Sequence, residues 1–176
     1  MLGSTRTENL APGTSNAPST GHREPRTLHY NRRMLNARIK RLRLDVSLPV
    51  YHTSESAGFD LAASEDVTVR PGEVKLVPTG LVIEVPHGHF LGVFARSSTP
   101  LKRGLMVANG VGVVDPDYSG PADEVKIEVV NFTQMAVELK KGDRIAQGIV
   151  MPCRQVAWSE VDEIRANSRG GFGATG

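Results

Sequence analysis

The residues best suited to catalysis lie in the segment 109–120, "NGVGVVDPDYSG". Its glycines, including Gly112, allow a tight hairpin whose backbone amides can bind the edge of a flat ligand. Asp115 and Asp117 bring two carboxylates close together, and Tyr118 supplies an aromatic wall. A carboxylate beside a bound phosphate can orient and deprotonate a water molecule, which is the role of a general base. The same residues are also compatible with a plain turn capped by Asp and Pro.

Two other segments carry groups that bind phosphate. In the first, "ARSST", Arg96 offers a forked donor that matches phosphate oxygens, and the hydroxyls of Ser97 and Ser98 follow it directly. In the second, "RGGFGATG" at 169–176, glycines let backbone amides approach an anion closely, and Phe172 offers a flat face for a base. The ordinary alternatives are a turn for the first segment and a flexible terminus for the second.

These segments are embedded in an apolar pattern with a period near two, which is typical of β-strands. Short turn signals rich in Gly, Pro and Asp separate the apolar runs, so we predict an all-β sandwich or barrel. A helical turn is expected only near 100–104 or 161–165. The expected strands cover 38–46, 80–86, 89–95, 124–132 and 143–151.

Composition limits the classes of function. The chain of 176 residues is long enough for one domain with a proper core, and no run approaches the roughly 20 apolar residues needed to cross a bilayer. The single cysteine excludes an internal disulfide and a Cys-based zinc site. The segment 1–33 holds five arginines against two glutamates, so the net charge of +2 leaves the remainder of the chain without a basic excess. We therefore expect no nucleic-acid partner and no membrane partner.

The same patterns divide the chain into three regions. Residues 1–33 are rich in Ser, Thr, Pro, Gly and Arg and have no apolar period, so we expect a disordered leader. Residues 34–166 are expected to form the β-domain, and residues 167–176 a mobile glycine-rich arm. Because no apolar run near the N-terminus looks like a signal peptide, we expect a cytoplasmic protein. The alternatives are organelle targeting by the leader and a natural start at Met34.

Five ordered motifs point to a known family. They are "AGFDLAA" (57–63), "ARSS" (95–98), "NGVGVVDPDYSG" (109–120), "KGDRIAQGIV" (141–150) and "RGGFGATG" (169–176). Together they resemble the motifs of the trimeric dUTP pyrophosphatases (dUTPases), and the resemblance spans residues 38–176. It implies a jelly-roll-like β-barrel, assembled as a homotrimer with three active sites at subunit interfaces. Each site would hydrolyse dUTP to dUMP and pyrophosphate, with Mg²⁺ on the triphosphate, which limits uracil incorporation into DNA and supplies dUMP for thymidylate synthesis.

The resemblance also implies a role for individual residues. Asp115 would orient water for attack on the α-phosphorus, and Gln147 would help to place that water or the α-phosphate. Asp60 would meet the metal through its water shell, and the C-terminal arm would close over the triphosphate as a lid. The substrate would be bound by Arg96, Ser97, Ser98, Asn109, Gly112, Val113, Tyr118, Arg169, Phe172, Gly173 and Thr175.

Two features depart from the family pattern. Asn167 stands where the arm usually has an arginine, so either Arg165 or Arg169 would meet the γ-phosphate. The segment 121–124, "PADE", is a short insertion after the third motif, and we expect a longer surface turn there. Two rival functions remain. A dCTP deaminase of the same fold would need a glutamate to drive attack at the ring, and a regulatory trimer would sense nucleotide without catalysis.

Overall fold

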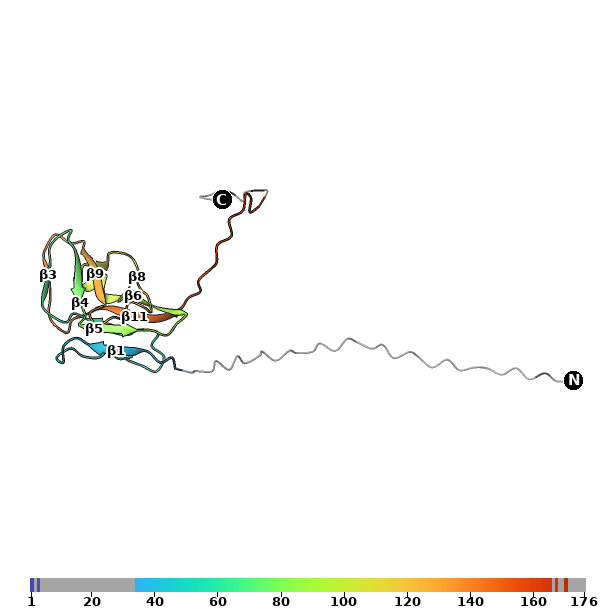
Figure 1. Ribbon diagram of the computed structural model, residues 1–176, viewed down its shortest axis with the longest axis horizontal. Helices are drawn as coiled ribbons and strands as arrows, with labels where there is room; N and C mark the ends of the chain where they lie inside the picture. Colours follow the sequence, from blue (N-terminus) through green and yellow to red (C-terminus); the bar gives the residue numbers. More distant parts are fainter. Residues whose placement is uncertain (2, 4–33, 166, 168–169, 171–176) are drawn as a thin grey trace. The chain divides into compact units, whose positions relative to one another are not determined.

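The computed structural model describes residues 1, 3, 34–165, 167 and 170. The chain divides into two units, 1–33 and 34–176, and all the described helices and strands lie in the second unit, which Figure 1 shows as short strands in layers. In chain order the elements are β1 (Arg38–Arg41), β2 (Phe59–Ala62), β3 (Val67–Val69), β4 (Val74–Pro78), β5 (Leu81–Glu84), β6 (His89–Ala95), α1 (Ser98–Arg103), β7 (Leu105–Val107), β8 (Gly112–Val114), β9 (Lys126–Asn131), β10 (Val137–Leu139) and β11 (Arg144–Pro152).

The strands form four antiparallel sheets. A four-stranded sheet has the order β2-β11-β6-β8, a three-stranded sheet has the order β4-β9-β7, and two-stranded sheets join β1 to β5 and β10 to β3. This nearly all-β architecture confirms the predicted fold class. The strand expected at 89–95 coincides with β6, and β11 is shifted by one residue from its expected range. Strands β1, β5 and β9 are shorter than the apolar runs that predicted them.

One short helix interrupts the strands. It is α1, which overlaps the helical turn expected near 100–104, whereas the other expected position, 161–165, is not helical. Gly104 ends α1 with a left-handed φ of 65°, and a Cβ atom at this position would collide with the side chain of Thr133. Only glycine satisfies both conditions. Among the residues described, no helix is long and apolar enough to cross a membrane.

Strand β11 lies in the middle of the four-stranded sheet and sets the positions of functional side chains. It pairs with β2 on one side and with β6 on the other, so Gln147 stands opposite both Asp60 and Phe94. Gly148 is buried, and a Cβ atom at this position would lie 2.5 Å from the Phe59 ring. The absence of a side chain at this position lets the three strands approach, and substitution by any larger residue would force them apart.

The segment that was expected to form a hairpin instead carries the chain between two sheets. Strand β7, before it, pairs with β9, whereas strand β8, after it, pairs with β6. A turn connects them: the N–H of Gly110 donates to the carbonyl of Val107 at 3.1 Å, and Gly110 has a φ of 73°. The prediction of a hairpin was therefore wrong. Sequence shows the turn, but the partners of the flanking strands are set by the tertiary fold.

Strand β1 borders β5 and links the start of the domain to the region after β8. The guanidinium of Arg38 pairs with Glu84, with Nη2 2.7 Å from Oε1. The Nζ atom of Lys40 donates to the carbonyl of Pro121 at 3.1 Å. Strand β1 ends at Arg41, whereas the predicted strand continued to residue 46. The chain turns after Arg41, whose side chain donates to the carbonyls of Leu44 and Val46 at 3.2 and 3.3 Å.

Candidate active site

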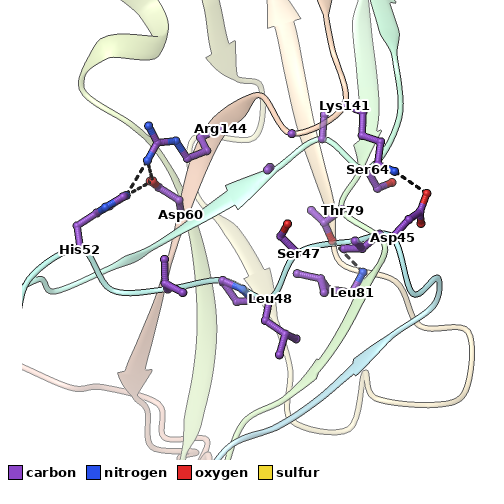
Figure 2. Close-up of a pocket in the computed structure, with 16 residues that line it drawn as sticks. Asp45, Ser47, Leu48, His52, Asp60, Ser64, Thr79, Leu81, Lys141 and Arg144 are labelled. Carbon is purple, nitrogen blue, oxygen red and sulfur yellow. Dashed lines mark hydrogen bonds and ion pairs between the residues drawn. The ribbon is translucent and has the colours of Figure 1, made fainter.

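Asp60, on β2, lies at the centre of a charged cluster. Its side chain is only 12% exposed, and both of its carboxylate oxygens have partners. Oδ1 lies 2.8 Å from Nε of Arg96, and Oδ2 lies 3.0 Å from Nη1 of Arg144. The Nε2 atom of His52 lies 2.7 Å from the same Oδ2. Figure 2 shows that His52, from the segment before β2, and Arg144, at the start of β11, both point toward Asp60. Two guanidiniums around one carboxylate leave the cluster with a positive excess that favours an anion.

Arg96 follows β6 and is held by an ion pair and a hydrogen bond. Its Nε forms an ion pair with Asp60, and its Nη1 donates to the carbonyl of Arg144 at 3.1 Å. These bonds fix the plane of the guanidinium beside a groove of about 470 Å³. The groove is polar and cationic, since its lining includes Arg96, Ser98, Lys102, Arg103 and Arg144. Such a surface suits a polyphosphate.

Of the other residues expected at the phosphates, Ser98 lines the same groove. Ser97 is the residue immediately before α1, and its side chain makes no capping bond to the helix. Ser98 is the first residue of α1 and lines the groove. Gln147 is half-buried on β11, and its Nε2 donates to the carbonyl of Ala95 at 3.1 Å. The structure thus brings Asp60 on β2, Gln147 on β11 and the residues that follow β6 together across three adjacent strands.

Helix α1 is tied to the start of β11 by buried and half-buried bonds. The hydroxyl of Thr99 donates to the carbonyl of Ile145 at 2.8 Å, and Arg103 makes two bonds of 2.8 Å to the carboxylate of Asp143. Burial alone would raise the pKa of Asp143. The bond from the Lys140 N–H and the pair with Arg103 outweigh burial and hold this pKa below its ordinary value. The groove therefore has one wall fixed by a charged pair.

Replacement of Asp143 by Asn should lower the free energy of unfolding by about 1–2 kcal/mol at pH 7, because it removes charge-assisted bonds at a half-buried site. A carboxyl whose pKa is lowered by folding stabilises the native state fully above its ordinary value, about 4, and loses this effect as the pH falls through the lowered folded value. The difference between wild type and Asp143→Asn should therefore shrink below about pH 4. Urea unfolding from pH 7 to pH 3 measures this difference.

Asp162→Asn is the control, because this carboxylate lies on the exposed segment after β11. It should change the unfolding free energy little at any pH. A difference for Asp143→Asn that is as small as for Asp162→Asn at pH 7, or that grows in acid, would contradict the assignment.

The residues of the third motif form a second, separate group. Asn109, Val113 and Asp115 are exposed, Gly112 is half-buried, and Tyr118 is 45% exposed. The N–H of Tyr118 donates to the carbonyl of Asp115 at 3.2 Å, which closes a turn directly after β8. The exposed groups of this turn include a carboxylate and an aromatic ring that a ligand could contact.

The insertion 121–124 follows this second group and is held by hydrogen bonds of its own side chains. The carboxylate of Asp123 accepts a bond from the N–H of Gly120 at 2.7 Å, and Oε1 of Glu124 accepts one from the N–H of Gly80 at 2.6 Å. The hydroxyl of Tyr118 lies 3.4 Å from the carbonyl of Glu124. The insertion is thus a surface turn, and its own side chains anchor it to the domain.

Within one chain Asp115 and Arg96 lie at opposite ends of β6. Val114, which precedes Asp115, pairs with Leu91, whereas Arg96 lies five residues beyond Leu91. At about 3.3 Å per residue, this places Arg96 about 17 Å from Val114 along the strand, and Asp115 lies one residue further away. A single chain therefore does not bring Asp115 to Arg96.

Some predicted residues lie outside the part of the chain that the structure describes. They are Arg169, Phe172, Gly173 and Thr175. Arg165 is described and exposed on the segment after β11. The choice between Arg165 and Arg169 as the γ-phosphate ligand therefore stays a prediction.

Two residues of the cluster were not predicted. Arg144 stands inside the fourth motif, three residues before Gln147, and a charged residue where a turn leads into a strand was a usable signal. His52 lies in an irregular segment with no periodic pattern, and no sequence signal connects it to Asp60. Asp60 also lines a second pocket of about 250 Å³, together with Leu48 and Leu81. Figure 2 shows the residues that line this pocket.

The antiparallel sheets, with a cationic cluster where β2, β6 and β11 meet, define an all-β protein that can hold a polyanion. The family model of dUTPase matches residues 45–176. The chain belongs to the dUTPase family.

Similar proteins agree with this membership. The deoxyuridine 5'-triphosphate nucleotidohydrolase of Nautilia profundicola is 41% identical over 144 residues, which cover 81% of this chain and 99% of the relative. That of Lactococcus lactis is 41% identical over 134 residues, covering 74% and 89%. The crystal structure of dUTPase from Streptococcus mutans has a TM-score of 0.63 at 35% identity, covering 68% of this chain and 98% of that chain. A dUTPase mutant of Staphylococcus bacteriophage 80alpha with dUpNHpp has a TM-score of 0.72 at 21% identity, covering 80% and 98%, and supports the fold alone.

Proposed function

We propose that this protein hydrolyses dUTP to dUMP and pyrophosphate. The observation that carries the proposal is the cluster of Asp60, Arg96 and Arg144 beside a cationic groove, in a chain that belongs to the dUTPase family. The relatives most similar in sequence carry the name deoxyuridine 5'-triphosphate nucleotidohydrolase. The groove matches the charge of a triphosphate, and the third motif offers the groups that a nucleoside needs.

In the proposed reaction, Asp115 accepts a proton from water while the water oxygen forms a bond to the α-phosphorus. The bond between the α-phosphorus and the oxygen that bridges to the β-phosphate breaks, and pyrophosphate leaves with the electron pair. Gln147 orients the water or the α-phosphate, and the guanidinium of Arg96 with Ser97 and Ser98 holds the phosphates. The proton then leaves Asp115 to solvent, which restores the carboxylate.

The rest of the third motif and the arm provide recognition in this proposal. Tyr118 packs beneath the deoxyribose and leaves no room for a 2′-hydroxyl, and the backbone from Asn109 to Val113 reads uracil through its polar edge. In the C-terminal arm, Phe172 stacks on the base and Gly173 and Thr175 close over the terminal phosphate, which is met by either Arg165 or Arg169. Closure of such an arm would exclude water from the triphosphate.

The donor set fits a divalent cation that arrives on the nucleotide, and we propose Mg²⁺. No group of three or more His, Cys, Asp or Glu side chains among the described residues could hold a metal. Asp60 offers one carboxylate, and Mg²⁺ is commonly held by one or two carboxylates, several waters and substrate phosphates. Asp60 would contact it through water. The cation supplies charge neutralisation on the triphosphate when bound.

We also propose that the protein assembles as a homotrimer whose active sites each combine residues of different subunits. The separation of Asp115 from Arg96 along β6 supports this, because one copy supplies the nucleoside group and another supplies the phosphate group. The sheet β4-β9-β7 carries exposed apolar side chains, namely Val74, Leu76 and Met106, and Phe132 follows it. A row of exposed apolar residues on one sheet suits burial against further copies of the chain.

The test is a pyrophosphate-release assay with purified protein, Mg²⁺ and dUTP, with dCTP and UTP as controls. We expect rapid release from dUTP and little from either control. Release of ammonia from dCTP would favour the deaminase. Binding of dUTP without turnover would favour a nucleotide sensor.

A further inference from the structure

His52 makes contacts in the cluster that the proposed reaction does not use. Its Nε2 atom lies 2.7 Å from Oδ2 of Asp60 and 2.7 Å from Nη1 of Arg144. The side chain is 53% exposed, whereas that of Asp60 is 12% exposed. His52 is thus the more exposed partner of the Asp60–Arg144 pair, and Figure 2 shows its interactions with both residues.

The backbone on both sides of His52 is anchored, so the imidazole is held in place. Before it, the ring of Tyr51 packs edge-to-face on the buried ring of Phe59, with centroids 5.6 Å apart. After it, Thr53 and Ser56 close a turn, in which the Thr53 N–H donates to Oγ of Ser56 at 3.0 Å. The residue between these anchors has little freedom to point elsewhere. Phe59 also precedes Asp60 directly, which couples this segment to the carboxylate.

The Nε2 atom of His52 can form a hydrogen bond with only one of its two neighbours at a time. This nitrogen carries either one proton or one lone pair. With a proton it donates to Asp60 and cannot accept from Arg144, and with a lone pair it accepts from Arg144 and cannot donate to Asp60. In either state His52 holds one of the two side chains by a hydrogen bond. The other side chain is held by the contact of 3.0 Å between Asp60 and Arg144. The imidazole therefore restricts both side chains to one arrangement.

We propose that His52 is a positioning residue, which holds Asp60 and Arg144 in the orientation that receives a metal-bound nucleoside triphosphate. This inference rests on the proposed function. Asp60 would meet the metal on the nucleotide, and Arg144 lines the groove that would receive the phosphates. Both would act on the nucleotide as soon as it is bound, so loss of their orientation should weaken binding more than turnover. Loss of a partner of a direct metal ligand commonly costs 10-fold to 100-fold in affinity, and because Asp60 would meet the cation through water, we expect a loss at the lower end of that range.

The experiment compares wild type with His52→Ala, His52→Gln and the control His87→Ala, whose side chain is exposed at the turn before β6. Gln is the informative variant, because its amide both donates and accepts and can serve Asp60 and Arg144 together. KM and kcat are measured with dUTP and Mg²⁺. The affinity for dUpNHpp, in which nitrogen replaces a bridging oxygen, is measured with Mn²⁺ by calorimetry.

For His52→Ala we expect KM to rise and the affinity for dUpNHpp with Mn²⁺ to fall by about tenfold, with kcat within about twofold of wild type. His52→Gln should restore most of both, and His87→Ala should match wild type. Wild-type values for His52→Ala, or a His52→Gln enzyme as impaired as His52→Ala, would overturn the proposal.

A measurement without nucleotide separates this inference from the proposed function. The ¹⁵N resonances of the His52 ring should move when Asp60→Asn is introduced, while those of His87 should not. Unmoved His52 resonances would overturn the positioning role even in an active enzyme. A wild type that neither hydrolyses dUTP nor binds dUpNHpp would overturn the proposed function, and with it the effect of His52 on nucleotide affinity, whatever the resonances show.

Discussion

Asp115→Asn should lower kcat for dUTP by about 10²–10⁴, the range for loss of a general base, with little change in KM. The amide has almost the same shape as the carboxylate but cannot take a proton from water. Asp115 is exposed at the end of β8, and its carbonyl closes the turn with Tyr118, so the substitution should leave the local fold intact. Steady-state pyrophosphate release measures the loss.

Asp117→Asn is the matched control, because this exposed carboxylate lies in the same turn. It should keep most of the wild-type kcat. A near-normal rate for Asp115→Asn would remove Asp115 as the base, and an equal loss in both variants would indicate a general effect of charge in the turn.

Mixing two inactive variants should restore activity. Asp115→Asn and Arg96→Ala each disable every site when expressed alone. If each site of a trimer takes Asp115 from one chain and Arg96 from the next, every trimer that contains both variant chains has one intact site among its three, so mixed trimers should recover about one third of the wild-type activity. Co-expression with two tags, purification through both tags and a pyrophosphate assay measure the recovery.

The control for this mixture is Arg96→Ala with Asp60→Asn. These two residues pair within one chain at 2.8 Å, so no combination of the two variant chains supplies both groups to one site. This mixture should stay inactive. Failure of the first mixture to recover, or recovery of both mixtures, would contradict a site shared between subunits.

The sequence predicts the fold best where side-chain alternation and pairing coincide. Strand β6 has both neighbours in the sheet, and its boundaries match the apolar run at 89–95. The run at 38–46 continues past the real end of β1, because hydrogen bonds from the Arg41 side chain turn the chain at a place where alternation does not change. Local pattern also could not assign β7 and β8 to different sheets, since that choice depends on contacts with β9 and β6.

The candidate site is predicted only in part for the same reason. Motif residues such as Arg96 and Gln147 carry chemistry in their types and spacing. Their junction with Asp60 comes from the register of β11 against β2, which a linear pattern does not contain. His52 has no motif at all, and only the fold brings it to the carboxylate.

Strand β1 has a further consequence for the behaviour of the protein at high concentration. It is exposed along its whole length and lies at the border of a two-stranded sheet, the kind of site where other chains add strands and aggregate. Three of its four residues are Arg or Lys. Their mutual repulsion between molecules opposes such growth, so the basic residues at the start of the domain help to keep the protein soluble.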